Sequence, residues 1–352
     1  MDLTDRRLSA QGLANSDLTG ADAVVERLLA VQAQDGRGAR LAIRSRLSGA
    51  VEKPTVALVD DALNDGRLVI GWLNRGTLHL VRAEDYRWLH AITGSRGATS
   101  NQTRLRQEGV SEAQAEKAVK MIVRTLADGP APRPVLRQKL ESAGIPVAGQ
   151  AMVHILYLAS IRSLIVRGPM AGKEQAFVLF SDWLGEPVAF DPDLHLPELA
   201  RRYLAGHGPA SDRDLAAWAG IPVGQARKGL AAIAGETEQL EERDAAGEVL
   251  LDLTGRREPP RPEAVRLLGN FDPVLHGWAS RDWIIPAAAE RGVVTVNGLF
   301  RPTILCGERI VGIWSMRDGQ IELAPFGDLD ERTAAALEKE RARVVSYLTG
   351  FG

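Results

Sequence analysis

The sequence predicts an α+β fold: three consecutive helical units, each ending in a β-hairpin, then a small antiparallel β-barrel-like unit and a C-terminal helix. Two observations lead to this prediction. Turn signals repeat along the chain at a nearly constant offset, and the apolar period changes from helical to alternating beyond a proline-rich stretch. With 352 residues, the chain is long enough for about two to four compact units.

An internal repeat defines two of the helical units. Leu126–Ala131 (LADGPA) returns as Leu204–Ala210 (LAGHGPA), and Ala143–Val147 (AGIPV) returns as Ala219–Val223, with offsets between 76 and 79 residues. Each copy is predicted to contain a helix, a Gly-Pro turn, a short helix, an Ala-Gly-Ile-Pro turn and a third helix. Tandem copies of one supersecondary unit are the simplest explanation.

A β-hairpin follows the third helix of each copy. In the first copy we expect a third helix over 149–164 and strands over 164–167 and 176–180. In the second, the third helix covers 223–233 and the return strand 249–253. Three helices followed by a hairpin describe a winged helix-turn-helix, so the copies are assigned to 111–190 and 191–255.

The N-terminal region, 1–110, fits the same template as a more divergent copy. Its expected elements are helices over 23–32, 39–47 and 56–64 and wing strands over 68–72 and 77–81. The sequence therefore predicts three tandem winged helices in the first 255 residues.

Residues 256–352 are predicted to form the barrel-like unit. Its first residues, 256–262, are a linker by composition. Alternating apolar residues then predict strands over 293–296, 301–305, 310–314 and 321–324, and a helix over 329–347 closes the chain.

Bulk composition is ordinary for a globular protein, with 45% hydrophobic and 25% charged residues. No apolar run approaches the roughly 20 residues needed to cross a bilayer, so we expect no membrane association and a cytoplasmic location. The single cysteine, Cys306, excludes an internal disulfide and a cysteine-based zinc cluster. The six histidines show no ligand spacing, and no phosphate-binding or nucleophile motif is present. The sequence therefore predicts neither a metal nor a cofactor.

Charge is unevenly distributed along the chain. Between residues 36 and 106, twelve Lys and Arg stand against six Asp and Glu, a balance of +6, whereas residues 235–252 hold one Arg against seven acids, a balance of −6. Such segregation suits a protein that attracts a polyanion with one face, although two separately solvated faces would give the same pattern.

The candidate catalytic residues are the glutamines of Val31-Gln32-Ala33-Gln34-Asp35. Gln32 continues the apolar face of the preceding helix, where a polar group needs a partner or a function, because an unsatisfied buried polar group costs roughly 1 to 3 kcal/mol. If the chain extends here, Gln32 and Gln34 point the same way and form a paired polar platform. The alternative is two ordinary amides at a helix end.

Further candidates follow the glutamine segment. Four arginines at near-helical spacing are candidates for phosphate contacts or, alternatively, line a solvated helix face: Arg37, Arg40, Arg44 and Arg46. His79 alternates with apolar neighbours on a predicted wing strand, where it would face either a DNA groove or solvent. Asp272 and His276 are expected to share a structural hydrogen bond across a turn.

Several segments resemble the AlkZ-like DNA glycosylases, a family that includes the AlkZ and YcaQ branches, and the similarity covers nearly the whole chain. The matching segments are Val31–Gln34, Asn74–His79, Asn270–Pro273, Asn297–Thr303 and Val311–Trp314. The family's catalytic motif is Gln, an apolar residue, then Gln in the AlkZ branch or Asp in the YcaQ branch. Gln34 places this chain nearer the AlkZ branch, and the small Ala33 is a mild departure.

The resemblance implies a monofunctional glycosylase that removes bulky alkylated purines, including interstrand crosslinks, from double-stranded DNA. An N7- or N3-alkylated purine is already cationic, so its departure needs little protonation. Catalysis then requires a held water and stabilisation of an oxocarbenium-like state, which two amides can provide. Asp35 is given a minor role, as negative charge or in activating water. We further expect a monomer, associated with the nucleoid, and an open channel in place of extensive base flipping.

Two other functions remain open at this point. A transcription regulator would use its winged helices to read one operator and would be expected to dimerise. Three dissimilar winged helices on one chain argue against this function, because they are not a two-fold symmetric pair that would match two operator half-sites. An inactive homologue that only binds damaged DNA is the other alternative, and Ala33 is the only sequence feature that favours it.

Overall fold

The computed structural model describes residues 2–349 except 15, 245 and 257–264. The chain folds into two compact units, one formed by Met1–Val59 with Asp191–Phe351 and the other by Asp60–Phe190. The predicted first segment, 1–110, is thus divided between the two. The predicted linker, 256–262, lies outside the described residues apart from Arg256.

The first unit begins with three short helices and an extended segment: α1 (Leu3–Ala10), α2 (Ala21–Leu28), β1 (Val31–Gln32) and α3 (Gly36–Arg44). The predicted helix over 23–32 is too long, because Leu29 adopts a positive φ of 62° and ends α2 before the glutamines. The Asp35 side chain then accepts a hydrogen bond from the Gly38 amide and starts α3.

The chain returns to this unit with three helices and a hairpin, in the order that the repeat predicts. These are α11 (Pro192–His207), α12 (Asp212–Ala219), α13 (Val223–Ala232), β7 (Thr237–Arg243) and β8 (Val249–Leu253). Ser211 and Asp214 form a reciprocal capping box at the start of α12, and Gly220 ends that helix in the left-handed conformation.

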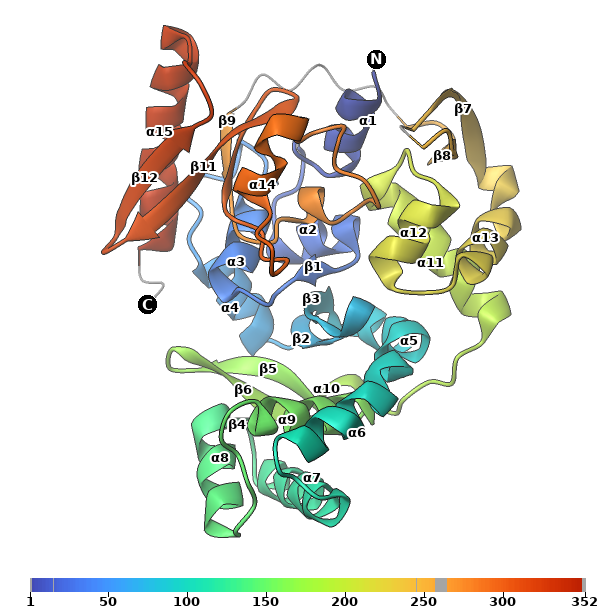
Figure 1. The fold of residues 1–352 in the computed structure, drawn as a ribbon, viewed down its shortest axis with the longest axis vertical. Helices are drawn as coiled ribbons and strands as arrows, with labels where there is room; N and C mark the ends of the chain where they lie inside the picture. The colour runs from blue at the N-terminus through green and yellow to red at the C-terminus, as the bar shows by residue number, and fades with distance from the viewer. Residues whose placement is uncertain (1, 15, 245, 257–264, 350–352) are drawn as a thin grey trace. The chain divides into compact units, whose positions relative to one another are not determined.

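An antiparallel sheet of strand order β12-β11-β10-β9 follows. Its strands are β9 (Val265–Leu268), β10 (Thr303–Cys306), β11 (Arg309–Arg317) and β12 (Gln320–Pro325), and α15 (Glu331–Leu348) lies alongside it (Figure 1). The strand predicted over 293–296 is wrong: Val293 ends a short helix, α14 (Glu290–Val293), and Val294 makes only an isolated bridge to Phe300. β9 is the fourth strand of the sheet instead. Within the described residues, β9 and β12 do not pair with each other, so the sheet does not close into a barrel.

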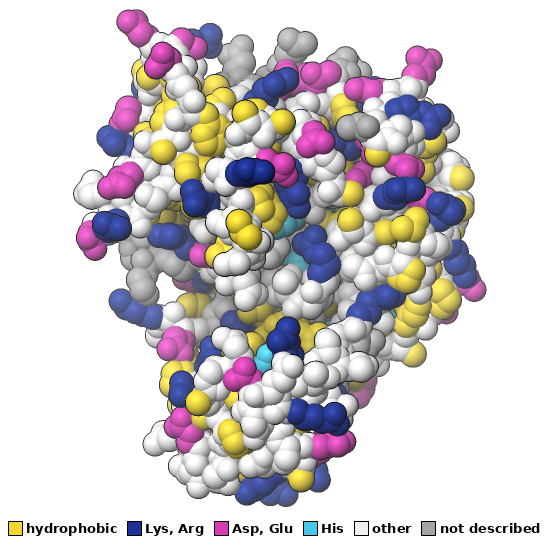
Figure 2. All heavy atoms as spheres, viewed as in Figure 1, with side chains coloured by type: hydrophobic (Ala, Val, Ile, Leu, Met, Phe, Trp, Pro, Cys, Tyr) yellow, Lys and Arg dark blue, Asp and Glu magenta, His cyan; other side chains and the backbone are white. Residues whose placement is uncertain are grey.

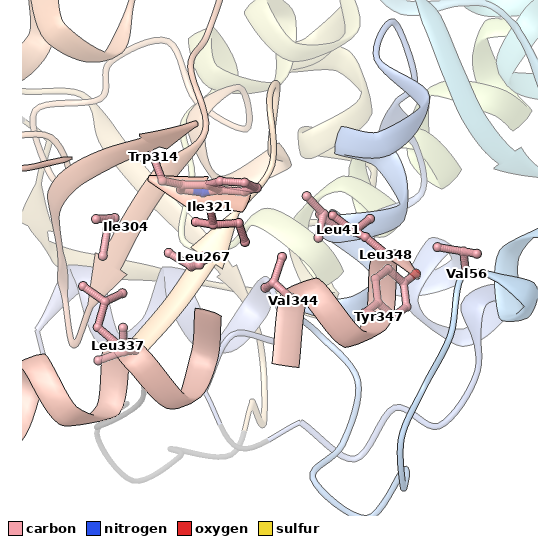
Figure 3. Packing of buried hydrophobic residues seen from close by; sticks show 11 residues of the cluster. Leu41, Val56, Leu267, Ile304, Trp314, Ile321, Leu337, Val344, Tyr347 and Leu348 are labelled. Carbon is pink, nitrogen blue, oxygen red and sulfur yellow. The ribbon is translucent and has the colours of Figure 1, made fainter. Parts of the chain in front are cut away.

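One hydrophobic cluster connects this sheet to the glutamine region. Leu267, Ile304 and Trp314 of the sheet pack with apolar residues of α15, and Leu41 of α3 joins them (Figure 3). The Tyr347 hydroxyl of α15 donates a hydrogen bond to the Arg40 carbonyl at 3.0 Å. The sheet and α15 therefore hold α3 in place.

The second unit is built around a five-stranded part of a sheet, ordered β3-β2-β5-β6-β4. Its strands are β2 (Leu68–Trp72), β3 (Leu78–Arg82), β4 (Ala131–Pro132), β5 (Ile165–Ala171) and β6 (Glu174–Leu179). β2 and β5 pair through Ile70 and Arg167, so the first two predicted hairpins join in one sheet. A buried shared sheet is more stable than either isolated hairpin.

Helices surround these strands: α5 (Ala83–Thr93), α6 (Ala98–Gln107), α7 (Glu112–Ala127), α8 (Arg133–Ser142), α9 (Ala151–Ile161) and α10 (Phe180–Leu184). The boundary between the two units falls within α4 (Ala57–Asn64). Short 3₁₀ helices are η1 (Asn74–Gly76), η2 (Gly94–Gly97), η3 (Ala234–Glu236), η4 (Pro273–Leu275) and η5 (Ala287–Ala289). Among the described residues, no helix is both long and apolar enough to cross a bilayer.

Candidate active site and nucleic-acid interface

The two candidate glutamines lie in a short connection between α2 and α3. Leu29 ends one helix, Asp35 caps the next, and Val31–Gln32 between them is extended. A connection anchored at both ends by helix termini has little conformational freedom. The local sequence therefore gives these amides a defined backbone position.

The two amides have different environments. Gln32 is 8% exposed, and its buried Oε1 atom has no hydrogen-bond partner in the described part of the chain. Gln34 is exposed, with the buried Ala33 between them. A buried amide oxygen without a partner is costly, which makes it a strong candidate for binding a water or stabilising positive charge. The two amides therefore differ in burial, and the paired platform expected from the sequence stays a prediction.

Asp35 and the first turn of α3 form a tight contact with a distant loop. The Asp35 Oδ1 atom accepts from the Gly38 amide at 2.5 Å. Any side chain at Gly38 would overlap the Asn270 carbonyl, and any side chain at Gly269 would overlap the Gly38 backbone. Two glycines therefore let the Asn270–Pro273 loop lie against the helix turn that follows the glutamines.

The same loop is held at its other end by a buried ion pair. Arg46 donates to both carboxylate oxygens of Asp272, at 2.7 and 3.0 Å, and both side chains are fully buried. Arg46 also donates to the Gln11 Oε1 atom at 2.8 Å, and Gln11 donates to the Gly206 carbonyl at 2.7 Å. Asp272 therefore bonds to Arg46 rather than to His276, whose ring packs against Phe300 at 4.0 Å between centroids. This network locks the loop, α3 and α11 together.

Three of the four arginines proposed for phosphate contacts are held inside the protein. Arg46 is fully buried in its ion pair, and Arg40 is 3% exposed and donates to the Gly36 carbonyl at 3.0 Å. Arg44 forms a bidentate ion pair with Glu340, at 2.7 and 3.0 Å. The expectation that Arg40, Arg44 and Arg46 contact DNA is wrong, because their side chains are buried and their guanidinium groups are hydrogen-bonded to other parts of the protein. Arg37, at the start of α3, is half-exposed.

His79 is also placed differently from either alternative, because it is only 3% exposed on β3. Its Nδ1 atom lies 3.0 Å from the Thr77 carbonyl, and burial lowers its pKa to about 3, with a small opposing effect of that hydrogen bond. The ring is therefore neutral near pH 7, and its burial contradicts the expectation that His79 faces a DNA groove.

A residue not singled out by sequence analysis stands out in the second unit. Asn74 is completely buried, and neither polar atom of its side-chain amide has a hydrogen-bond partner within the residues that the structure describes. It begins a turn in which Arg75 and Gly76 have positive φ angles of 56° and 72°. Strain and an unsatisfied amide in one turn mark Asn74 as a further candidate polar contact. Its only sequence signal is its place in a family-matching segment.

On the face of the molecule that Figure 2 shows, the charge segregation along the chain does not appear as a uniform basic surface. In the view of Figure 2, Lys and Arg side chains are interspersed with Asp and Glu. Several arginines counted in the basic stretch, such as Arg46 and Arg44, are paired with carboxylates that come from much later in the sequence. The net charge counted along this stretch of sequence therefore overstates the positive charge that is available to a polyanion.

No described group of residues points to a resident metal. One set of carboxylates, Asp2, Asp5 and Glu308, has oxygens within 4.8 Å of one another. Asp2 already serves as the cap of α1, accepting from the Asp5 amide at 2.9 Å. Acidic clusters of this kind are common without an ion, and the glutamine segment is not part of this one.

Comparison with known proteins identifies the class. Residues 25–347 match the model of the family described as DNA glycosylase AlkZ-like, so the chain belongs to that family of DNA glycosylases. It is 26% identical over 353 residues to the interstrand DNA cross-link repair glycosylase of Streptomyces sahachiroi, covering 96% of this chain and 93% of the relative. The solved structure of the DNA glycosylase AlkZ from the same organism superposes with a TM-score of 0.77 at 24% identity, over 98% and 95% of the two chains. The family inferred from the motifs and the mixed α+β fold are thereby confirmed.

Proposed function

We propose that this DNA glycosylase hydrolyses the N-glycosidic bond of bulky N7- or N3-alkylated purines in double-stranded DNA and unhooks interstrand crosslinks. Family membership supports glycosidic hydrolysis on DNA. The Streptomyces sahachiroi relative is named for interstrand crosslink repair. Such a substrate would place the protein at the nucleoid, and we propose that it acts as a monomer without a cofactor.

The observation that carries this proposal is the buried, unpartnered Oε1 atom of Gln32. This acceptor has no partner among the described residues, whereas other buried polar side chains of the same unit, such as those of Gln11 and Asp272, are hydrogen-bonded. An oriented carbonyl dipole in a site with little solvent interacts strongly with developing positive charge. Gln32 therefore stabilises the oxocarbenium-like sugar, and the exposed Gln34 holds the attacking water.

The reaction balances without an acid or a base on the protein. Water adds to the anomeric carbon as the bond from that carbon to the purine nitrogen breaks, and the bonding electron pair neutralises the cationic purine. The proton from the added water passes to solvent. Glutamine suits both roles, because its amide both accepts and donates hydrogen bonds and does not titrate.

The helical repeats provide the proposed DNA-binding framework. We interpret α7–α9 with β5–β6 and α11–α13 with β7–β8 as two winged helices, and 256–352 as a C-terminal β-unit. The third winged helix, proposed over 1–110, is divided between the two compact units. Arg37 is the remaining arginine of the motif region proposed to contact a phosphate. A bulky or crosslinked base cannot readily swing into a tight pocket, so we propose an open binding surface rather than extensive flipping.

The decisive experiment measures abasic sites. A duplex with a single N7-alkylguanine, and a second with a nitrogen-mustard crosslink, are incubated with wild type, Gln32→Ala and Gln34→Ala and then treated with alkali. Losing an oriented dipole of this kind lowers catalytic rates by about 10² to 10³. We expect that loss for Gln32→Ala, with DNA affinity nearly unchanged.

Gln102→Ala provides the matched control, because Gln102 is an exposed glutamine on α6. It should retain wild-type excision. If wild type binds the alkylated duplex but produces no abasic sites, the protein only recognises damage. Unaltered excision in both motif variants would refute the proposed roles of the two glutamines.

A further inference from the structure

A pocket of about 590 Å³ lies at the C-terminal end of α3, away from the glutamine segment at its other end. We call it the α15 pocket, because α15 forms one wall; the loop after α3 and strand β9 form the others. Its charged lining residues are Arg44, Glu52, Lys53, Arg266, Glu340 and Arg343. Four cations thus face two carboxylates.

One of these carboxylates is already saturated. Glu340 is 4% exposed, receives both hydrogen bonds of the Arg44 guanidinium, and also accepts from the Leu267 amide at 3.3 Å. The second, Glu52, is exposed and adjoins Lys53 in the loop. Positive charge at Arg266 and Arg343 is therefore not neutralised by an ion pair within the described part of the chain.

Arg266 is the distinctive residue of the pocket. It is half-buried on β9, and the bond it makes is a donation to the neighbouring Val265 carbonyl at 3.2 Å. Burial lowers its pKa; Glu340 opposes this effect, whereas the positive charges of Arg44 and Arg343 add to it. A guanidinium held near two like charges, for which the described residues supply only that one hydrogen bond, favours an incoming anion.

The geometry points to a phosphate-binding site, with Arg266 and Arg343 as its ligands. Guanidinium groups match phosphate oxygens in bidentate geometry, and a phosphate would restore the charge balance of the pocket. The phosphate belongs either to the DNA backbone outside the lesion or to a free phosphate compound. This site goes beyond the proposed reaction, since it shares no residue with the glutamine segment.

The test uses the double variant Arg266→Gln/Arg343→Gln. The control is Arg341→Gln, which removes a charge from α15, the helix that carries Arg343, at a residue that is already paired with Glu338. Binding of an undamaged duplex is measured by fluorescence anisotropy over a range of salt, and binding of inorganic pyrophosphate by calorimetry. Neither readout depends on excision, so failure here is distinguishable from failure of the glycosylase proposal.

A DNA phosphate as the occupant predicts that the double variant loses duplex affinity and that the slope of log K against log salt falls by about one. A free phosphate compound predicts that wild type and Arg341→Gln bind pyrophosphate and the double variant does not, with duplex binding unchanged. Equal behaviour of the double variant and the control in both assays would overturn the proposal. Because Arg343 is exposed, Arg343→Glu supplies a second variant that does not disturb a buried position, and it should show the same losses.

Discussion

Polar side chains near the two ends of α3 have contrasting hydrogen-bonding environments. At the C-terminal end, Arg44 and Arg46 each form a bidentate ion pair with a carboxylate from a distant part of the chain. At the N-terminal end, the buried carbonyl oxygen of Gln32 has no partner among the residues described, and Gln34 is exposed. The contrast teaches that the paired arginines Arg44 and Arg46 support the fold at one end, whereas the glutamines at the other end remain available for their proposed roles in binding and catalysis.

The largest expected effect is a loss of stability when the buried ion pair beyond the C-terminal end of α3 is broken. Asp272→Ala leaves the Arg46 charge buried and unpaired, so the free energy of unfolding should fall by about 3 to 5 kcal/mol. Chemical denaturation at equilibrium measures this. The combined change Arg46→Met/Asp272→Leu removes both charges and should recover most of the loss.

The exposed Arg162–Glu116 pair is the matched control, because it is also bidentate, at 2.6 and 3.0 Å. Glu116→Ala should cost no more than about 1 kcal/mol, since solvent screens an exposed pair. Similar losses for Asp272→Ala and Glu116→Ala would contradict the supporting role of the buried pair.

The next effect is a dependence of stability on pH, caused by the buried His207 at the end of α11. Burial lowers the pKa of His207 to about 3; a hydrogen bond to the Tyr203 carbonyl opposes this, and the charges of Arg46 and Arg256 add to it. Below pH 6.5 the unfolded chain binds a proton that the folded protein does not, so stability falls as pH falls. Between pH 7 and pH 5 this histidine should contribute a loss of about 2 kcal/mol.

Denaturation of wild type and His207→Phe at the two pH values measures that contribution. The variant should lose less stability than wild type on acidification. An identical change in both proteins would show that His207 does not remain neutral in the folded state.

A smaller effect is expected at the start of α3. Asp35→Ala removes the helix cap and should cost about 1 kcal/mol of stability, with a modest reduction in excision as the glutamine segment loosens. Asp35→Asn should preserve both, because asparagine caps equally well. A severe loss of excision in a stable Asp35→Asn protein would instead assign the carboxylate a role in activating water.

The smallest expected effect is that of pH on the reaction itself. Neither glutamine titrates, so excision of a cationic N7-alkylguanine should be nearly constant between about pH 6 and about pH 9. Single-turnover rates measured across this range test the prediction. A sigmoidal or bell-shaped profile would require an ionisable catalytic group.

Local patterns predicted many of the secondary elements. The helix over 223–233 and the strands over 68–72 and 249–253 agree closely with α13, β2 and β8, because turn residues and apolar period act locally. The strand predicted over 293–296 was wrong, since a β-branched run is compatible with more than one backbone state. β9 was missed because four residues after a proline-rich linker carry too little periodicity to be recognised.

The sequence by itself determined the mixed α+β class, the tandem repeat, the glutamine motif and the family. Each of these can be recognised from patterns along the sequence. Only the tertiary structure decided which polar groups are used up. Arg46 and Asp272 are 226 residues apart, and Arg44 and Glu340 are 296 apart. Whether a charged side chain contacts solvent or a buried partner depends on such distant contacts, because desolvation is a property of the folded surroundings. For the same reason, only the fold separates the buried, unsatisfied Gln32 from the exposed Gln34.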